Sequence, residues 1–402
     1  MMVQYKFHKP LEVIYKRQDQ VIKYLNFADK INYKKRIYMD QNLFHFRDRR
    51  LAKSAVEKIE SLLEGSQKIM HVCGTHEYTI CKAGIRSLLP PSLELIAGPG
   101  CPVCICPSKD IDEAIFLAER EIILTSFGDM LRVPTSQGSL MGIRGKGADV
   151  RLVYSPKDAV EVARANPDKE VVFFSVGFET TAPTTASVIL DTPPENFSIL
   201  SSHRLVPPAM EFLLNIKDIG ISGFLLPGHV STIIGTKPYE RFSDVYRVPQ
   251  VIAGFEPLDV LIGTFMLLKQ IKNNTPSVEN EYARIVSEEG NLKAQEVMNA
   301  AFKTESASWR GIGVISSSGL VLRKEFEEYD ARMKYADIIP EFDSQDILPG
   351  CKCHLVILGK SRPRDCPLFG KICSPQNPRG PCMVSEEGSC RISFEYEELS
   401  DI

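Results

Sequence analysis

The stretch that decides the fold is LELIAGPGCPVCIC, residues 93–106. Its first part, Leu93–Ala97, is an apolar run with the length of a buried strand, and it stops at a Gly-Pro-Gly turn. Three cysteines follow within six positions, at Cys101, Cys104 and Cys106. In sheets built from parallel strands, ligands bind beyond the carboxyl ends of the strands. We therefore expect this turn to place thiols at the mouth of a parallel sheet.

Short apolar runs alternate with helical patterns through the middle of the chain. Stretches of helical spacing, such as Ser108–Arg120 and Pro156–Ala165, lie between runs that have the length of strands. This alternation indicates βαβ units and parallel sheets, so we predict an α/β fold. The candidate strands are Lys68–Val72, Leu93–Ala97, Glu121–Thr125, Val171–Val176, Phe197–Ser201, Gly223–Leu226 and Gln250–Ala253.

The length of 402 residues allows two or three domains. We expect two βαβ domains, residues 46–150 and 151–270, with a boundary in GIRGKGADV at residues 142–150. Residues 1–45 form a polar N-terminal extension whose order the sequence leaves open. Residues 271–402 contain a polar segment, at residues 270 to 310, that we expect to be helical, followed from residue 339 by a tail rich in Pro, Gly and Cys. Such a tail has few apolar runs, so we expect a metal centre to hold it together.

Composition and charge limit the classes of function. Hydrophobic residues make up 44% of the chain and charged residues 25%, as in ordinary globular proteins. A net charge of −3 gives no reason to expect binding to nucleic acid or to an anionic membrane surface. The chain has no apolar run of the roughly 18 residues that a membrane span needs, and its start lacks the apolar centre of a secretory signal. We therefore expect a cytoplasmic protein.

The distribution of the eleven cysteines carries most of the chemical information. Five lie between residues 73 and 106, six lie between residues 351 and 390, and the long middle of the chain has none. In a reducing compartment, a cysteine-rich pattern is more often metal-binding or catalytic than a disulfide framework. The gap therefore indicates two functional groups of thiols.

Three loops that follow candidate strands carry the first group of candidate site residues. Cys73 and His76 follow the first strand, Cys101 and Cys104 follow the second, and His229 follows a later one. If these strands are neighbours, the loops converge on one crevice. The dipole of a helix that opens at a Cys-x-x-Cys favours the reactive thiolate. A zinc site made from these cysteines and His76 remains an alternative.

Other residues near the same strands have less certain roles. Cys81 lies in a helical stretch and is expected to be a buried apolar residue, and Cys106 has no assigned role. His71 and His203 flank strands and are expected to be structural. Glu179 lies in a strand-to-helix turn, where it either caps the helix or acts as an acid or an anchor for a ligand nitrogen.

The six tail cysteines have no repeated Cys-x-x-Cys knuckle, which argues against a zinc ribbon. Four thiolates suffice for one [4Fe–4S] cluster, so two cysteines remain as a spare dithiol. A cluster beside a dithiol converts between one-electron and two-electron transfer. A purely structural zinc or iron–sulfur centre with two free thiols is the alternative. The six are Cys351, Cys353, Cys366, Cys373, Cys382 and Cys390.

Seven strings between residues 46 and about 398 resemble, in order, the HypD hydrogenase maturation factors, which help to assemble the iron centre of [NiFe] hydrogenases. The strings are VCGTHEYTI, GIRSLLP, GPGCPVC, GFETTAP, LPGHVSTIIG, GFEPLDVL and CPLFGKICSPQNPRGPCMVSEEGSC. The resemblance implies two α/β domains plus a small Cys-rich C-terminal iron–sulfur domain. It also implies two partners, a HypC-type small chaperone and a HypE-type cyanide donor that carries a thiocyanate. On this view an iron receives two cyanides and one carbon monoxide.

The resemblance also implies three sets of site residues. The iron site has Cys73 as a ligand and His76 close by, with the thiol pair Cys101 and Cys104 near the iron. The implied cluster ligands are Cys351, Cys366, Cys373 and Cys390, and the implied redox pair is Cys353 and Cys382.

The chain departs from the family pattern in three places. Tyr78 stands where members often have a second histidine, Cys106 is not a family feature, and the N-terminal extension is longer than usual. We expect a maturation scaffold with redox-assisted cyanide transfer rather than a metabolic enzyme. The rivals are a zinc-stapled partner-binding module and a thiol–disulfide reductase. The leading hypothesis requires the tail cysteines to lie close to Cys73 in space.

Overall fold

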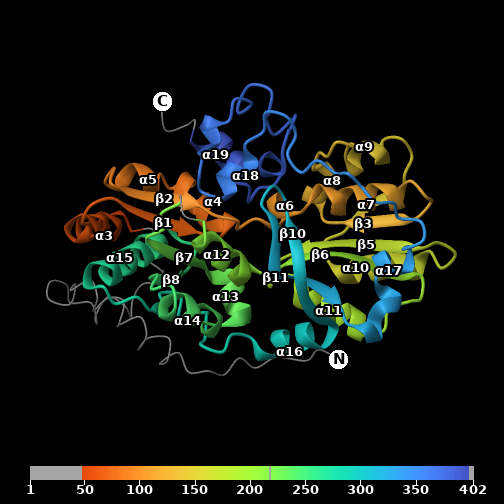
Figure 1. The fold of residues 1–402 in the computed structure, drawn as a ribbon, viewed down its shortest axis with the longest axis horizontal. Helices are drawn as coiled ribbons and strands as arrows, with labels where there is room; N and C mark the ends of the chain where they lie inside the picture. The colour runs from red at the N-terminus through yellow and green to blue at the C-terminus, as the bar shows by residue number, and fades with distance from the viewer. Residues whose placement is uncertain (1–47, 217–218, 398–402) are drawn as a thin grey trace, which may run out of the picture.

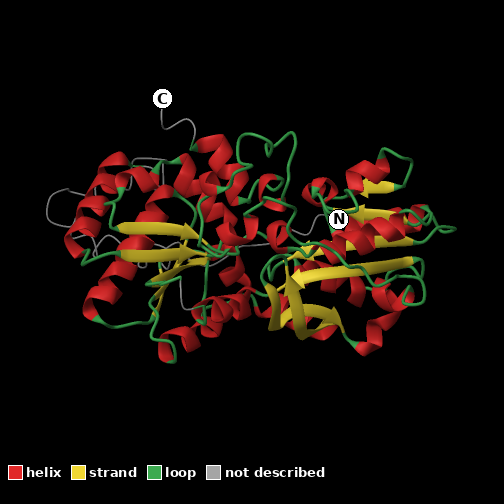
Figure 2. Ribbon diagram, turned by 45° about the horizontal axis from the view of Figure 1, so that its top comes forward, coloured by secondary structure: helices red, strands yellow, loops and turns green. Residues whose placement is uncertain are grey.

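The computed structural model describes residues 48–216 and 219–397, so the predicted extension of residues 1–45 lies outside the described residues. Two sheets lie side by side, helices cover both faces of each, and the C-terminal tail packs beside their junction (Figure 1). In Figure 2 the strands of the two sheets form separate groups in the two halves of the molecule. The predicted α/β class is confirmed.

The first sheet has five parallel strands, and β7 and β8 are buried at every position, as in parallel sheets covered on both faces. Its order is β2 (Leu93–Ala97), β1 (Gln67–His71), β7 (Gly223–Pro227), β8 (Gln250–Ala253) and β9 (Val278–Asn280). One face packs on α3 (Arg49–Leu62) and α15 (Pro257–Asn273). The other packs on α12 (Val206–Leu214), α13 (Gly228–Ile234) and α14 (Lys237–Asp244).

The second sheet has four parallel strands and an antiparallel hairpin at one edge. Its order is β10 (Phe302–Trp309), β11 (Gly313–Leu322), β6 (Phe197–Arg204), β5 (Val171–Gly177), β3 (Ile123–Ser126) and β4 (Val150–Leu152). One face packs on α7 (Ser108–Ala118), α8 (Gly128–Arg132), α9 (Leu140–Arg144) and α17 (Ala331–Lys334). The other packs on α10 (Pro156–Ala165), α11 (Ala182–Leu190), α16 (Leu292–Ala301) and the turn η1 (Lys324–Tyr329).

The chain passes between the two sheets three times. It leaves the first sheet after β2, builds β3 to β6 of the second, returns for β7 to β9, and then adds β10 and β11 to the second. The predicted boundary at residues 142–150 therefore falls between β3 and β4, inside one sheet, and the ranges 46–150 and 151–270 do not follow the sheets. A βαβ unit has the same sequence pattern whether its next strand joins the same sheet or the other one. The pattern therefore could not predict which strands share a sheet.

All seven predicted strands are present, and β2 and β8 have the predicted bounds. The sequence patterns missed β4 and β9, which have three residues each, and both strands of the hairpin. Residues 302–309 were expected to be helical but form β10, whose middle positions are mostly exposed. Short or exposed strands lack the apolar run that indicates a buried strand.

Local signals explain some helix starts, and tertiary contacts explain others. The Ser155 hydroxyl accepts a hydrogen bond from the Asp158 N–H (3.2 Å), so Ser155 is the N-cap of α10. In α7 the residue before the helix is Pro107, which has no capping side chain. Instead the Asp346 carboxylate accepts the Ser108 N–H at 2.8 Å from 238 residues away.

The tail is short of regular structure and packs on the first sheet and on the turn after β2. Its elements are α18 (Cys353–Ile357), α19 (Ser389–Tyr396) and the short turns η2 (Pro363–Asp365) and η3 (Pro381–Met383). In Figure 1 α18 and α19 lie above the carboxyl ends of β1 and β2, beside α4 (Gly74–Lys82), and α5 (Ile85–Leu88) lies further out. Within the described ranges, no helix has the length and apolar character needed to cross a membrane.

Candidate metal and thiol site

The strands β1, β2 and β7 are neighbours, so the three predicted loops leave the same edge of the first sheet. Between the first two loops and the tail lies a small cavity. Cys73, Cys101 and Cys104 line it from the sheet side, with His71 and Glu77 behind them. Ile357, Glu387 and Ser389 line it from the tail.

Cys73 is the residue at which β1 turns into α4. Its backbone is extended, and it stands at the N-cap position of α4, where its side chain accepts no capping hydrogen bond from the described residues. Burial and the nearby Glu387 carboxylate raise the pKa of Cys73 to about 11, although the backbone N–H groups of Thr75 and His76 act in the opposite direction. The free thiol is therefore protonated near neutral pH, and a bound metal ion would displace the proton.

Two glycines allow the backbone around Cys73 to pack closely. The Gly74 N–H donates to the Gly100 carbonyl at 3.2 Å, which joins the loop after β1 to the loop after β2. A Cβ atom on Gly100 would overlap the backbone of Cys73, and one on Gly74 would overlap Glu387 of the tail. The tight turn that the sequence predicted at Gly100 therefore has a structural reason: the backbone of Cys73 lies so close that only glycine fits there.

Cys101 and Cys104 form a disulfide across the single turn of α6 (Pro102–Ile105). Cys101 is the N-cap of this turn, and its sulfur accepts the Cys104 N–H at 3.2 Å. Both residues are buried. The sequence predicted the pair and its place after β2, and a disulfide is the oxidised form of such a dithiol.

His76 is buried one helical turn beyond Cys73. Its Nε2 lies 2.9 Å from the Gly254 carbonyl and 3.3 Å from the Ala253 carbonyl, so this nitrogen carries the proton. Its Nδ1 is buried and has no hydrogen-bond partner in the part of the chain that the structure describes. Burial lowers the pKa of His76 to about 3, so the ring is neutral. A neutral ring with an unpaired Nδ1 offers a lone pair to a metal or a proton donor.

A buried ionic network lies directly behind Cys73. His71 Nδ1 lies 3.2 Å from the Cys73 carbonyl, and His71 Nε2 lies 2.8 Å from the Glu77 carboxylate. Arg86 donates to the same carboxylate at 2.6 Å. Burial would raise the pKa of Glu77, but Arg86 and the His71 bond hold it well below its ordinary value. His71, which we expected to be only structural, therefore links a fixed anion to the backbone of Cys73.

The other two cysteines of the first group lie outside the cavity. Cys81 is buried as predicted, but it is not in an apolar setting, because Arg86 donates to its sulfur at 3.0 Å. Arg86 also pairs with Glu397 of the tail at 3.4 Å. The Cys106 sulfur contacts the Ser202 hydroxyl of β6 at 3.4 Å, so Cys106 faces the second sheet.

The six tail cysteines are all buried, and several lie within contact of one another. The sulfurs of Cys351 and Cys353 are 3.1 Å apart. The Cys382 thiol forms hydrogen bonds with the thiols of Cys353 and Cys390. These two bonds lower the pKa of the Cys382 thiol. Gly380 passes so close that a Cβ atom there would lie 2.9 Å from the Cys351 sulfur.

The donor set of the tail suits an iron–sulfur cluster. Among the described residues, no group of three or more His, Cys, Asp or Glu side chains is arranged around a single metal ion. A [4Fe–4S] cluster takes one thiolate on each of four irons, and the tail offers six thiols in one buried region. The residues present therefore fit such a group by number and chemistry.

The tail meets the sheet mouth through two contacts. The turn η3, which carries Cys382, packs on α6, which carries Cys104. The helix α19, which carries Cys390, packs on α4, which begins beside Cys73. The two cysteine groups, although 245 residues apart at their nearest positions in the sequence (106 and 351), thus adjoin one buried cluster of side chains.

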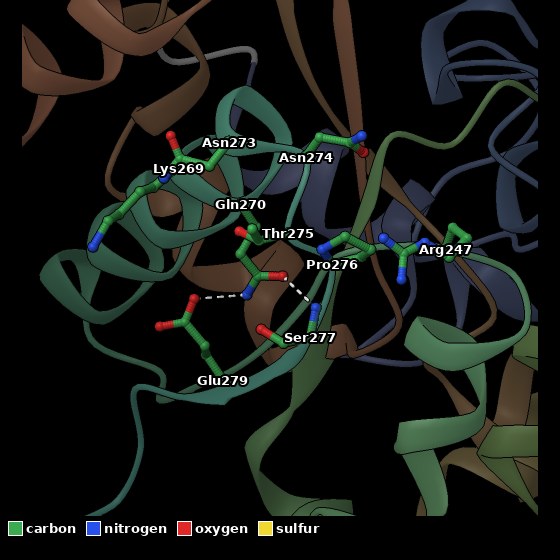
Figure 3. A pocket seen from close by; sticks show the side chains of 9 residues that line it. All are labelled: Arg247, Lys269, Gln270, Asn273, Asn274, Thr275, Pro276, Ser277 and Glu279. Carbon is green, nitrogen blue, oxygen red and sulfur yellow. Dashed lines mark hydrogen bonds between the residues drawn. The ribbon is translucent and has the colours of Figure 1, made fainter.

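A second hollow lies near the amino ends of β8 and β9, at the edge of the sheet opposite to the cysteines (Figure 3). Its polar side chains bond to one another: Gln270 donates to Glu279 at 2.8 Å and accepts the Ser277 N–H at 3.0 Å. It contains no cysteine or histidine. The chemistry of the molecule therefore points to the smaller cavity at Cys73.

Comparison with known proteins agrees with this geometry. Residues 50–397 match the HypD family model, described as the hydrogenase formation hypA family. The chain belongs to the HypD family. A putative hydrogenase expression/formation protein of Methanocaldococcus jannaschii is 47% identical over 362 residues, which cover 89% of this chain and 100% of the relative.

Relatives named as maturation factors are similarly close. The hydrogenase maturation factor HypD2 of Bradyrhizobium diazoefficiens is 43% identical over 370 residues, covering 89% of this chain and 97% of the relative. The hydrogenase maturation factor HypD of Escherichia coli is 44% identical over 336 residues, covering 82% of this chain and 89% of the relative. The chain is thus a hydrogenase maturation factor of the HypD family.

Of the site residues predicted at strand ends in this HypD-family chain, only Cys73, Cys101 and Cys104 line the cavity, while His76, Glu179 and His229 do not. Glu179 accepts the Val206 N–H at 2.8 Å, so it caps α12 rather than its own helix, and its Oε2 is buried without a partner among the described residues. Burial raises the pKa of Glu179 to about 7. His229 is exposed and stacks on Phe255, with 3.9 Å between ring centroids. The Phe255 ring in turn lies beside the His76 ring, with 5.1 Å between the ring centroids.

Sequence reasoning missed Glu387, which belongs to the string that carried the tail resemblance. It is exposed at the rim of the cavity, and the Thr75 hydroxyl donates to it at 3.4 Å. Only its position before Gly388 and Cys390, in SEEGSC, could have drawn attention to it. Its proximity to Cys73 depends on the docking of the tail.

Proposed function

We propose that this maturation factor is the scaffold on which the Fe(CN)2CO moiety of [NiFe] hydrogenases is assembled, in a complex with a HypC-type small chaperone. The observation that carries the proposal is the single cavity that Cys73, the Cys101–Cys104 disulfide and the tail line together. In this proposal the iron is the substrate. Cys73 supplies a thiolate, the Nδ1 lone pair of His76 lies one turn away, and the chaperone supplies a further ligand. Soft thiolate ligands suit such an iron.

The disulfide supports a role in releasing cyanide. A HypE-type donor carries cyanide as a thiocyanate, and breaking its S–CN bond into a thiolate and cyanide needs two electrons. The reduced Cys101–Cys104 pair supplies both electrons when it closes to the disulfide and releases two protons. The cyanide then binds the iron at Cys73, and the donor recovers its thiol. The disulfide in the structure corresponds to the pair after this step.

The tail supports a route for reducing the disulfide again. We propose that Cys351, Cys366, Cys373 and Cys390 hold a [4Fe–4S] cluster, which supplies single electrons. Cys353 and Cys382 act as the redox pair, and the sulfur contact between them suits this role. Because η3 packs on α6, electrons from Cys382 have a short path to the Cys101–Cys104 disulfide.

The iron site is tested by Cys73→Ala. We expect the variant, co-purified anaerobically with the chaperone, to fold and to lose the infrared bands of iron-bound cyanide and carbon monoxide. Cys106→Ala is the matched control, because Cys106 is also buried but faces the second sheet. Persistence of the bands in Cys73→Ala would show that the iron is held elsewhere.

One rival is favoured by the disulfide itself: a thiol–disulfide reductase would also contain it. A reductase turns over generic disulfides without any chaperone, whereas the cavity here is small and its Cys101–Cys104 disulfide is buried. The scaffold proposal predicts negligible turnover of such substrates. Metal analysis tests the tail separately: four irons per chain support the cluster, and stoichiometric zinc in colourless protein supports the zinc-stapled binding module.

A further inference from the structure

Arg310 lies in the turn between β10 and β11, outside all seven strings that carried the family resemblance. Its side chain is among the largest that are fully buried, with 1% of the residue exposed. Its N–H donates to the carbonyl of Ile105 at 2.9 Å. Ile105 is the last residue of α6, so this turn is fixed to the helix that carries Cys104.

The same turn is also fixed to the tail. The Arg310 Nε donates to the Asp346 carbonyl at 2.8 Å, and the Gly311 N–H donates to the Asp346 carboxylate at 3.0 Å. A Cβ atom on Gly311 would lie 2.6 Å from the Cβ of His354 in α18. The turn between β10 and β11 therefore packs against α6 on one side and against the cysteine-bearing tail on the other.

The guanidinium of Arg310 is only partly satisfied by oxygen acceptors. Its Nη2 donates to the Pro134 carbonyl at 2.9 Å, while its Nη1 is buried and has no hydrogen-bond partner among the described residues. An arginine is charged at all relevant pH values, and leaving a buried donor unpaired is unfavourable. The next residue, Gly311, packs against His354, which follows Cys353 in α18. The turn therefore brings the charge of Arg310 to the part of the tail that carries the cysteines.

We propose that Arg310 is a positioning residue that stabilises the electron-rich form of the tail's sulfur centre. The inference rests on the proposed function, in which Cys351 is a ligand of a [4Fe–4S] cluster. A cluster held by four thiolates gains a further negative charge when it accepts one electron from a low-potential carrier. A buried cation stabilises the reduced form more than the oxidised form, and hydrogen bonds to sulfur act in the same direction. Arg310 therefore raises the reduction potential of the cluster, which in this proposal supplies electrons toward Cys104.

The test compares Arg310→Gln with Arg310→Lys in the full-length protein, using potentiometric titration monitored by electron paramagnetic resonance. We expect Arg310→Gln to lower the equilibrium constant for reduction by about tenfold, which is about 59 mV toward negative potential. Arg310→Lys keeps the positive charge, so we expect it to shift the reduction potential less than Arg310→Gln does. Arg132→Gln is the matched control, since Arg132 also donates to the tail, at the Pro375 carbonyl, but is exposed.

A second measurement does not depend on any variant folding. In wild-type protein with 15N-labelled arginine, pulsed spectroscopy of the reduced cluster should detect a guanidinium nitrogen coupled to the iron–sulfur spin. No coupling, or an Arg310→Gln protein with a full cluster and an unchanged potential, would overturn the inference. Wild-type protein without four irons per chain would instead overturn the cluster proposal on which the inference rests.

Discussion

Two buried glutamates near the sheet mouth show how neighbours decide the charge of a carboxyl group. Glu77 has Arg86 and His71 against it, and its pKa is held well below the ordinary value, so it remains an anion. Glu179 has no cation paired with it among the described residues, and burial raises its pKa to about 7 against the effect of its own N–H and the Val206 N–H. Burial alone thus favours the neutral form, and only a paired cation reverses the effect.

Glu179→Gln tests this difference through the pH dependence of stability. The pKa of Glu179 rises from 4.5 to about 7 on folding, so the folded state binds its proton more tightly. The contribution of its protonation to the free energy of unfolding is full below about pH 4.5 and is lost as the pH rises through about 7. It is on the order of 3 kcal/mol in total.

Glutamine is neutral at every pH and keeps the acceptor for Val206. We expect denaturant unfolding to show Glu179→Gln gaining stability relative to wild type between about pH 5 and about pH 8. Glu161→Gln, at an exposed ion pair with Arg164, is the control and should show no such trend. Parallel stability profiles for wild type and Glu179→Gln would contradict the argument.

At the scale of elements, the two loops after β1 and β2 behave as one unit. Gly74 and Gly100 bring their backbones into contact, and the tail closes over them at Glu387. The position of Cys73 therefore depends on the turn after β2 as much as on its own strand. The disulfide of α6 is carried by the same turn.

Gly100→Ala tests this coupling, because the added methyl overlaps the Cys73 backbone. We expect a loss of about 1–3 kcal/mol in the free energy of unfolding, and faster alkylation of Cys73 as the turn moves away. Gly142→Ala in α9 is the control, since its nearest neighbour would be the Ser139 hydroxyl at 3.4 Å. Equal stability and equal alkylation in both variants would show that the turn adapts freely.

At the scale of the whole molecule, one carboxylate holds three parts of the fold together. Asp346 accepts the Ser108 N–H at the start of α7 and the Gly311 N–H of the hairpin turn, and it precedes the first tail cysteine by five residues. The tail is thereby fixed to the second sheet, while α19 packs on the first. Docking of the tail therefore depends on both sheets.

Asp346→Ala removes both acceptors and leaves two N–H groups without them. We expect residues 340–397 to be cleaved several-fold faster in limited proteolysis and to exchange amide hydrogens faster, because the segment opens more often. Asp343→Ala is the control, as Asp343 lies three residues away and is exposed. Similar cleavage rates in the two variants would mean that other contacts hold the tail.

The sequence by itself determined the local structure and the grouping of the chemistry. The seven predicted strands, the helix Pro156–Ala165 and the turn at Gly100 follow from patterns that repeat within a few residues. The positions of Cys73, Cys101 and Cys104 after strands β1 and β2 follow from the same patterns, and the strings around them indicated the family. The proposed roles of these cysteines and of the tail remain predictions.

Only the tertiary structure decided which strands share a sheet, which residues surround Cys73 and where the tail docks. The capping of α7 by Asp346, the bond of His71 to Glu77 and the burial of Arg310 between α6 and the tail belong to this level. Burial patterns record that a side chain faces a core, but they do not name the partner across it. Partner choice arises from contacts between distant segments, and those contacts form only when the whole chain has packed.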